Sequence, residues 1–124
     1  MMNFETIRND FEVKYRFLTF EEGGRKTGPP YQGYRCDWLY KDDLVESSAL
    51  REYMIWPIFM DEKGNPWAGG SPVPNEGIAQ MVIVSDEWRS IHRRRIDLGT
   101  EGYFMEGPRR VAEASVNRVV DLLN

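Results

Sequence analysis

Residues 11–20 (FEVKYRFLTF) alternate between apolar and polar side chains, and residues 34–40 (YRCDWLY) repeat that pattern. A period of two puts the apolar side chains on one face, as in a strand that is buried on one side only. The stretch between the two segments contains Gly23 and Gly24, and glycines allow the positive φ values that a turn or bulge requires. The pattern therefore predicts two antiparallel strands joined by this stretch.

Short apolar runs predict two further strands, at residues 53–60 and 78–84. Because Pro57 has no backbone donor for a strand ladder, the first of these is expected at a sheet edge or at a bulge. Residues 41–52 have only weak periodicity, and we interpret them mostly as loop. Residues 67–77 (WAGGSPVPNEG) are too rich in Gly and Pro for regular structure.

The last third of the chain predicts another short strand near residues 91–98 and then two strands that are broken at 106–108. Residues 111–124 fit both helical and strand spacing, and composition does not decide between the two. Six or seven short strands with turns between them are typical of a small antiparallel barrel. The fold class predicted is all-β, a closed antiparallel barrel of about six strands, made by one domain over residues 1–124.

Composition narrows the classes of function. The 16 Lys and Arg residues against 20 Asp and Glu residues leave a net charge of −4, the opposite of what a nucleic-acid-binding protein usually carries. No apolar run approaches the roughly 20 residues of a membrane-spanning helix, and the first ten residues contain no apolar core of a secretory signal. These features predict a cytoplasmic protein outside the membrane. Cys36 is the single cysteine, which excludes an internal disulfide, and we interpret it as a small packed residue.

Motifs for catalysis or cofactor binding are not recognisable. There is no G-x-x-x-x-G-K-[ST] stretch for a nucleotide, no metal-ligand spacing, no pair of catalytic carboxylates and no Ser-His-Asp set, so we predict neither a cofactor nor an enzyme. His92, the only histidine, could titrate near neutral pH, but the sequence identifies no partner for it. The adjacent run Arg93–Arg95 would alternate between the two faces of a strand, which favours solvated surface over a single basic patch.

Three short motifs carry a resemblance to a known family. The first resembles the start of the third, C-terminal β-barrel domain of bacterial elongation factor Tu. Its matching residues are Glu21, Glu22, Gly23, Gly24, Arg25 and Thr27, followed by Gly33, Tyr34 and Arg35. A later turn and the closing hairpin of that domain are similar to Val73, Pro74, Asn75 and Glu76 and to Glu106, Gly107, Pro108, Arg109, Arg110 and Val111. The resemblance covers nearly the whole chain except residues 41–72, and it implies that the last segment is a strand at least as far as Val119.

The resemblance also implies positions that would face RNA. The family's barrel contacts the T-stem backbone of tRNA, and the corresponding positions are Asp37, Glu106 and Gly107. Asp37 stands where the family has a neutral amide, and a carboxylate repels a phosphate. Cys36 stands where the motif has proline. Both departures argue against inherited tRNA binding.

The basic residues of the first motif have two interpretations. Arg25, Lys26 and Arg35 could form a phosphate-binding patch, since successive N–H groups of a Gly-containing turn can hold an anion. Alternatively, Glu21 or Glu22 pairs with Arg25 or Arg35 and fixes the turn, which the acidic net charge favours.

Trp67 lies in a loop rich in Gly and Pro, and an aromatic residue in such a place is typical of a protein interface. We therefore expect Trp67 to be exposed and to serve a partner. The leading hypothesis is a non-catalytic protein-binding module without a GTPase domain, working through the 61–77 loop and a rim formed by residues 21–35 and 106–110. Two alternatives stay open, namely a protein that binds tRNA-like RNA and an acidic immunity protein or antitoxin that neutralises a basic toxin.

Overall fold

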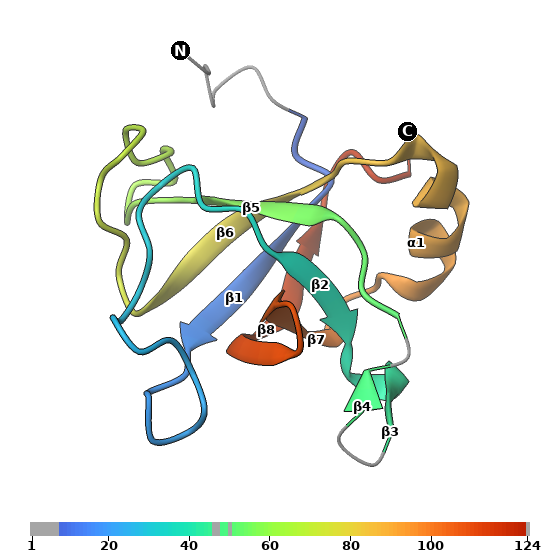
Figure 1. Ribbon diagram of the computed structural model, residues 1–124. Coiled ribbons are helices and arrows are strands. Elements are labelled where there is room, and N and C mark those ends of the chain that lie inside the picture. The colour runs from blue at the N-terminus through green and yellow to red at the C-terminus, as the bar shows by residue number, and fades with distance from the viewer. Residues whose placement is uncertain (1–7, 46–47, 50, 124) are drawn as a thin grey trace.

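The computed structural model describes residues 8–45, 48–49 and 51–123. Within them, most residues of regular structure belong to one antiparallel sheet with the strand order β2-β7-β8-β1-β6-β5. Its strands are β1 (Phe11–Phe17), β2 (Asp37–Tyr40), β5 (Ile55–Phe59), β6 (Glu76–Ile83), β7 (Glu101–Glu106) and β8 (Arg109–Val119). The smaller elements are the hairpin of β3 (Leu44–Val45) and β4 (Ser48–Ala49), helix α1 (Arg89–Arg95) and two 3₁₀ turns at Lys41–Asp43 and Asp86–Trp88. Figure 1 shows the sheet curled into a half-barrel, with α1 at one side.

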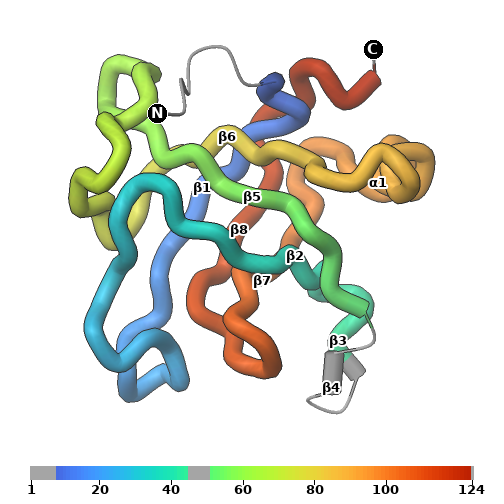
Figure 2. Tube along the Cα trace, turned by 45° about the horizontal axis from the view of Figure 1, so that its top comes forward, coloured from blue at the N-terminus to red at the C-terminus, as the bar shows by residue number. Residues whose placement is uncertain are grey.

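The sheet is not closed, so the predicted closed barrel is wrong. Its two edge strands, β2 and β5, are neighbours in space (Figure 2). Among the described residues they are joined by one bridge next to β5, where Trp38 and Tyr53 exchange backbone hydrogen bonds of 2.7 and 2.9 Å. From that bridge onward the two edges do not pair. We call the open line between β2 and β5 the seam.

The backbone of β5 explains why the seam stays open. The N–H of Ile55 turns back to the carbonyl of Tyr53 at 3.0 Å. Pro57 has no N–H to offer. The side-chain amide of Gln32 takes the next position, since its Oε1 accepts from Phe59 N–H at 3.0 Å and its Nε2 donates to Phe59 O at 2.9 Å. The β5 edge therefore has no donor left for β2, and the prediction that Pro57 marks an edge strand is confirmed.

The predicted pairing of the first two strands is wrong. β1 lies in the middle of the sheet between β8 and β6, whereas β2 lies at an edge next to β7. The connecting segment is no hairpin loop, because it runs along one side of the half-barrel beside the 66–72 loop before it reaches β2 (Figure 1). Gln32 N–H donates to Ser71 O at 2.7 Å and Tyr31 forms a bridge with Pro72, and these contacts hold the two segments together.

The strand predicted near residues 91–98 is also wrong, because the chain forms α1 there. Arg89 and His92 are buried, as is Ile96 after the helix, whereas Arg93 and Arg94 face solvent. Positions i, i+3 and i+7 lie on one face of a helix, not of a strand. The sequence obscured this pattern because two of the three inward residues are polar.

The remaining strand predictions hold with small shifts at their ends. β6, β7 and β8 form as expected, with a turn at Gly107 between the last two, and β8 ends at Val119 as the resemblance implied. The segment 41–52, interpreted as loop, contains a 3₁₀ turn and the β3–β4 hairpin, while its residues 46–47 and 50 lie outside the described residues.

The core lies on the concave face of the curled sheet. The four apolar residues of β1 from Phe11 to Phe17 are all buried, which confirms the predicted alternation. Their rings meet those of other strands edge-on, with centroid separations of 5.1 Å for Tyr15 and Phe59 and 5.8 Å for Phe11 and Trp38. Burying an aromatic side chain of this size contributes about 1.5–3 kcal/mol. Aromatic side chains therefore make up much of the core.

The candidate interaction surface

The structure brings four of the seven predicted site residues together at the seam. Arg35, Asp37, Glu106 and Gly107 line an open depression of about 220 Å³. The other residues of its lining are Cys36, Met54, Trp56 and Met105. The predicted rim thus exists, but it continues onto β5, which sequence reasoning did not connect with it.

Arg25 reaches this rim through Glu106 and Tyr34. Its guanidinium forms an ion pair with the Glu106 carboxylate, which also accepts a hydrogen bond from the Tyr34 hydroxyl. The Arg25 Nε–H donates to Gly28 O at 2.8 Å, and the guanidinium carbon lies 5.1 Å from the centroid of the Tyr34 ring. The contacts tie the first motif to the β7–β8 hairpin.

The predicted pairing of Glu21 or Glu22 with Arg25 or Arg35 is wrong. Glu22 instead forms an ion pair with Arg16 of β1 at 2.9 Å, while the charge of Arg25 is neutralised by Glu106. The turn is still fixed by an acid, since Glu22 also accepts from the backbone N–H of Thr19. Lys26 is exposed, and the charge of its neighbour in sequence, Arg25, is already balanced by Glu106.

Trp67 does not belong to this rim, and it is half-buried rather than exposed. Its indole N–H donates to Met60 O at 3.1 Å, and its own carbonyl accepts from the side chain of Gln32. The ring packs against the core, so Trp67 fastens its loop. Met54, at 52% exposure, is the large apolar side chain that the seam offers to solvent.

Two tryptophans flank Met54, and each lies beneath an arginine. The Arg35 guanidinium lies 4.1 Å from the Trp56 ring, and that of Arg51 lies 4.4 Å from the Trp88 ring. Trp88 and Arg51 line a second depression of about 310 Å³, which also includes Met54. The two depressions therefore share Met54, and we define the seam surface by seven residues. They are Arg35, Asp37, Arg51, Glu52, Met54, Trp56 and Trp88.

Two carboxyl groups of the seam surface lie in partly desolvated positions. Burial raises the pKa of Asp37 above its ordinary value. Burial and the charge of Asp37 together raise the pKa of Glu52. Burial, with Asp37 and Glu106 in support, also raises the pKa of the Cys36 thiol, so Cys36 is an inert packed residue rather than a nucleophile.

His92 lines the second depression from its inner side. Its Nδ1 lies 2.6 Å from the Tyr40 hydroxyl oxygen, and the Tyr53 ring packs edge-on against it with centroids 4.7 Å apart. Burial and then the positive charge of Arg95 lower the pKa of His92 to about 4. His92 therefore stays neutral at neutral pH, whereas the sequence alone left open that it titrates in this range.

Acid should destabilise the fold through His92. The unfolded chain binds this proton with a pKa near 6.5 and the folded chain only near 4, so the contribution to stability is complete above pH 6.5 and is lost as the pH falls towards 4. Between these values the wild type should lose about 1 kcal/mol per pH unit more than His92→Gln. Urea unfolding of both proteins at pH 7.5, 6.5, 5.5 and 4.5 (about one unit apart) measures this, and parallel curves would contradict it.

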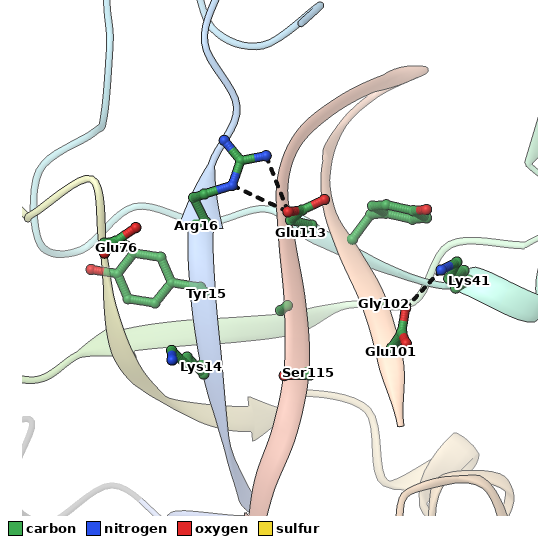
Figure 3. A pocket seen from close by; sticks show the side chains of 11 residues that line it. Lys14, Tyr15, Arg16, Lys41, Glu76, Glu101, Gly102, Glu113 and Ser115 are labelled. Carbon is green, nitrogen blue, oxygen red and sulfur yellow. Dashed lines mark hydrogen bonds and ion pairs between the residues drawn. The ribbon is translucent and has the colours of Figure 1, made fainter. Parts of the chain in front are cut away.

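A further open pocket, of about 430 Å³, lies on the outer face of β1, β8 and β7 (Figure 3). Four of its six charged side chains form two ion pairs with one another. Arg16 bends towards Glu113 at 3.1 Å, and Lys41 towards Glu101 at 2.8 Å. Since cations and carboxylates balance here, the pocket is solvated outer sheet face, and the seam surface is the better candidate site.

No protein-family model matches the chain, and no curated protein shows significant similarity to it. Among the described residues, no helix has the length and apolar character needed to cross a membrane. The described part of the chain likewise contains no group of three His, Cys, Asp or Glu side chains placed to hold a metal ion.

Proposed function

We propose that the chain is a non-catalytic protein-binding module that resembles the third domain of elongation factor Tu and binds its partner through the seam surface. The observation that carries the proposal is the exposed Met54 between the Arg35–Trp56 and Arg51–Trp88 pairs. Met, Arg and Trp are enriched in protein interfaces, and Trp and Arg dominate their binding energy. Two open depressions on either side of Met54 give a partner's side chains a place to enter.

The resemblance to elongation factor Tu supports the proposal through the contacts of its motif residues. Arg25 and Tyr34 belong to the first motif and Glu106 to the closing hairpin, and the three side chains form one cluster. Residues that are far apart in the sequence thus act as one structural unit at the rim. We therefore propose that this half-barrel belongs to the same class as the third domain of elongation factor Tu.

RNA binding receives less support than protein binding. Of the three cations that could form a phosphate patch, Arg25 is paired with Glu106, while Arg35, which lies over the Trp56 ring, and Lys26 are exposed. Asp37 on the same rim repels phosphate. An immunity protein or antitoxin is a special case of the leading proposal, because it also binds a protein.

Affinity capture from the lysate of the source cell tests the proposal with three baits. They are the wild type, Met54→Lys and the matched control Leu98→Lys, which places the same charge on a side chain that is 69% exposed and lies outside the seam surface. We expect a stoichiometric protein that survives nuclease and binds to the wild type and to Leu98→Lys, but not to Met54→Lys. Thermal unfolding of all three baits confirms that each is folded.

Two other results would overturn the proposal. One is a protein that Met54→Lys captures as well as the wild type does, since its interface would then lie elsewhere. The other is tRNA or rRNA that is recovered at low salt, is lost at moderate salt and disappears with Arg25→Ala or Arg35→Ala.

A further inference from the structure

The seam surface contains two carboxylates that have no partner among the side chains that the structure describes. Asp37 lines the first depression and Glu52 the second. The Oε1 atom of Glu52 is buried and has no hydrogen-bond partner among the described residues. Among the described residues, neither the Asp37 nor the Glu52 carboxylate takes part in an ion pair or accepts a side-chain hydrogen bond.

The other carboxylates of comparable burial behave differently. Each buried or half-buried Asp and Glu elsewhere in the described chain accepts a hydrogen bond or forms an ion pair. They are Asp10, Glu12, Asp43, Asp61, Glu106 and Asp121. Burying a charged group is costly unless it is paired, and the buried or half-buried carboxylates that the structure describes follow that rule except at Asp37 and Glu52. The two exceptions lie on either side of one exposed side chain, Met54.

The nearest basic side chains of the surface do not neutralise the two carboxylates. Arg35 and Arg51 lie on the faces of Trp56 and Trp88, as described above, and no cation of the described residues lowers the pKa of either carboxyl group. The place of a counter-ion is therefore open. This place is lined by Met54 and by the Arg35–Trp56 and Arg51–Trp88 pairs. Their apolar atoms suit the aliphatic stem of a long basic side chain.

We propose that the partner inserts a lysine or arginine side chain between Asp37 and Glu52, with its aliphatic part against Met54. The inference rests on the proposed function and adds the chemistry of the partner, a protein with a basic anchor residue. Two carboxylates from neighbouring segments can accept separate N–H groups of a guanidinium or ammonium, and charge-assisted hydrogen bonds of this kind are stronger than neutral ones. The acidic net charge of the chain would attract such a partner over longer range.

The test compares the double variant Asp37→Asn/Glu52→Gln with the matched control Glu21→Gln/Glu62→Gln. The control removes the same two charges from exposed side chains outside the seam surface. We expect the double variant to lose affinity for the purified partner by about tenfold or more, and the control to bind like the wild type. The thermal midpoint of the double variant should be unchanged or raised, since it removes unpaired charge, and this separates lost binding from lost folding.

A second measurement does not need the partner. The probe is the capped peptide Gly-Arg-Gly, and its neutral counterpart Gly-citrulline-Gly has nearly the same shape without the charge. In a titration followed by nuclear magnetic resonance, we expect the arginine peptide to shift the backbone amide signals of Asp37, Glu52 and Met54, and the citrulline peptide to leave them in place. Equal responses to the two peptides would overturn the inference.

The two proposals fail in different ways. If Met54→Lys abolishes partner binding while Asp37→Asn/Glu52→Gln binds as tightly as the wild type, the seam surface is the interface and the basic anchor is wrong. If no captured protein depends on Met54, the proposed function is wrong, and the peptide titration alone decides whether the two carboxylates bind a cation.

Discussion

Asp10→Ala should lower the free energy of unfolding by about 3–5 kcal/mol, the range expected when one partner of a buried ion pair is removed. The Asp10 side chain is fully buried, and its Oδ1 lies 2.8 Å from both Arg8 Nε and Arg89 Nη2. Its Oδ2 accepts a hydrogen bond from Ile83 N–H at 2.9 Å. Alanine would leave the Arg89 guanidinium, at 10% side-chain exposure, without its counter-ion, and the Ile83 N–H without an acceptor.

Urea unfolding of three variants measures this effect. Asp10→Asn keeps an acceptor for Ile83 N–H but removes the charge. We therefore expect it to lower the free energy of unfolding by less than Asp10→Ala does. Glu12→Ala is the matched control, because it breaks the more exposed pair with Arg118 and should cost less than about 1 kcal/mol. A loss from Asp10→Ala as small as that from Glu12→Ala would contradict the prediction.

The Asp10 cluster also explains how α1 is held against the sheet. Asp10 precedes β1, Ile83 ends β6 and Arg89 begins α1, so one carboxylate joins three elements. Arg89 also donates to the backbone carbonyl of Asp121, which fixes the C-terminal segment. Because Trp88 of the seam surface directly precedes α1, this buried cluster positions part of the proposed interface.

The parts of the fold that could be predicted are those set by local pattern. The alternation in residues 11–17 and the turn at Gly107 are local signals, and the structure has β1 and the β7–β8 hairpin there. Closure of the sheet depends instead on contacts between distant segments. The side chain of Gln32 forms hydrogen bonds with the backbone N–H and C=O of Phe59. The sequence pattern around either residue does not predict that contact.

The candidate site could be predicted in part for the same reason. Arg35, Asp37 and Glu106 came from motifs with a recognisable order, and they meet at one depression. Met54 and Glu52 belong to no such motif. They matter because they lie at the seam, where Met54 is exposed and the neighbouring side chains that the structure describes leave Glu52 unpaired. A carboxylate without a partner is visible only when the surrounding side chains are in place.

The second large effect is expected at Gly102→Ala, which should destabilise the fold by about 3 kcal/mol or more. Gly102 lies in β7 opposite Tyr40, and a Cβ atom there would come within 2.2 Å of Trp38 Cζ2. Trp38 cannot move away, because it is fully buried and packs edge-on against Phe11 and Tyr40 at 5.8 Å each. Space for the ring, rather than backbone freedom, requires glycine at this position.

Gly77→Ala is the matched control, since Gly77 also lies in a strand and a Cβ atom there would stand 3.3 Å from the Tyr15 hydroxyl. That contact needs a shift of only a few tenths of an ångström, so the loss should stay below about 1 kcal/mol. Adding Trp38→Phe to Gly102→Ala should recover part of the lost stability, because the smaller ring leaves room for the methyl group. Additive losses in the double variant would show that the clash with Trp38 is not the cause.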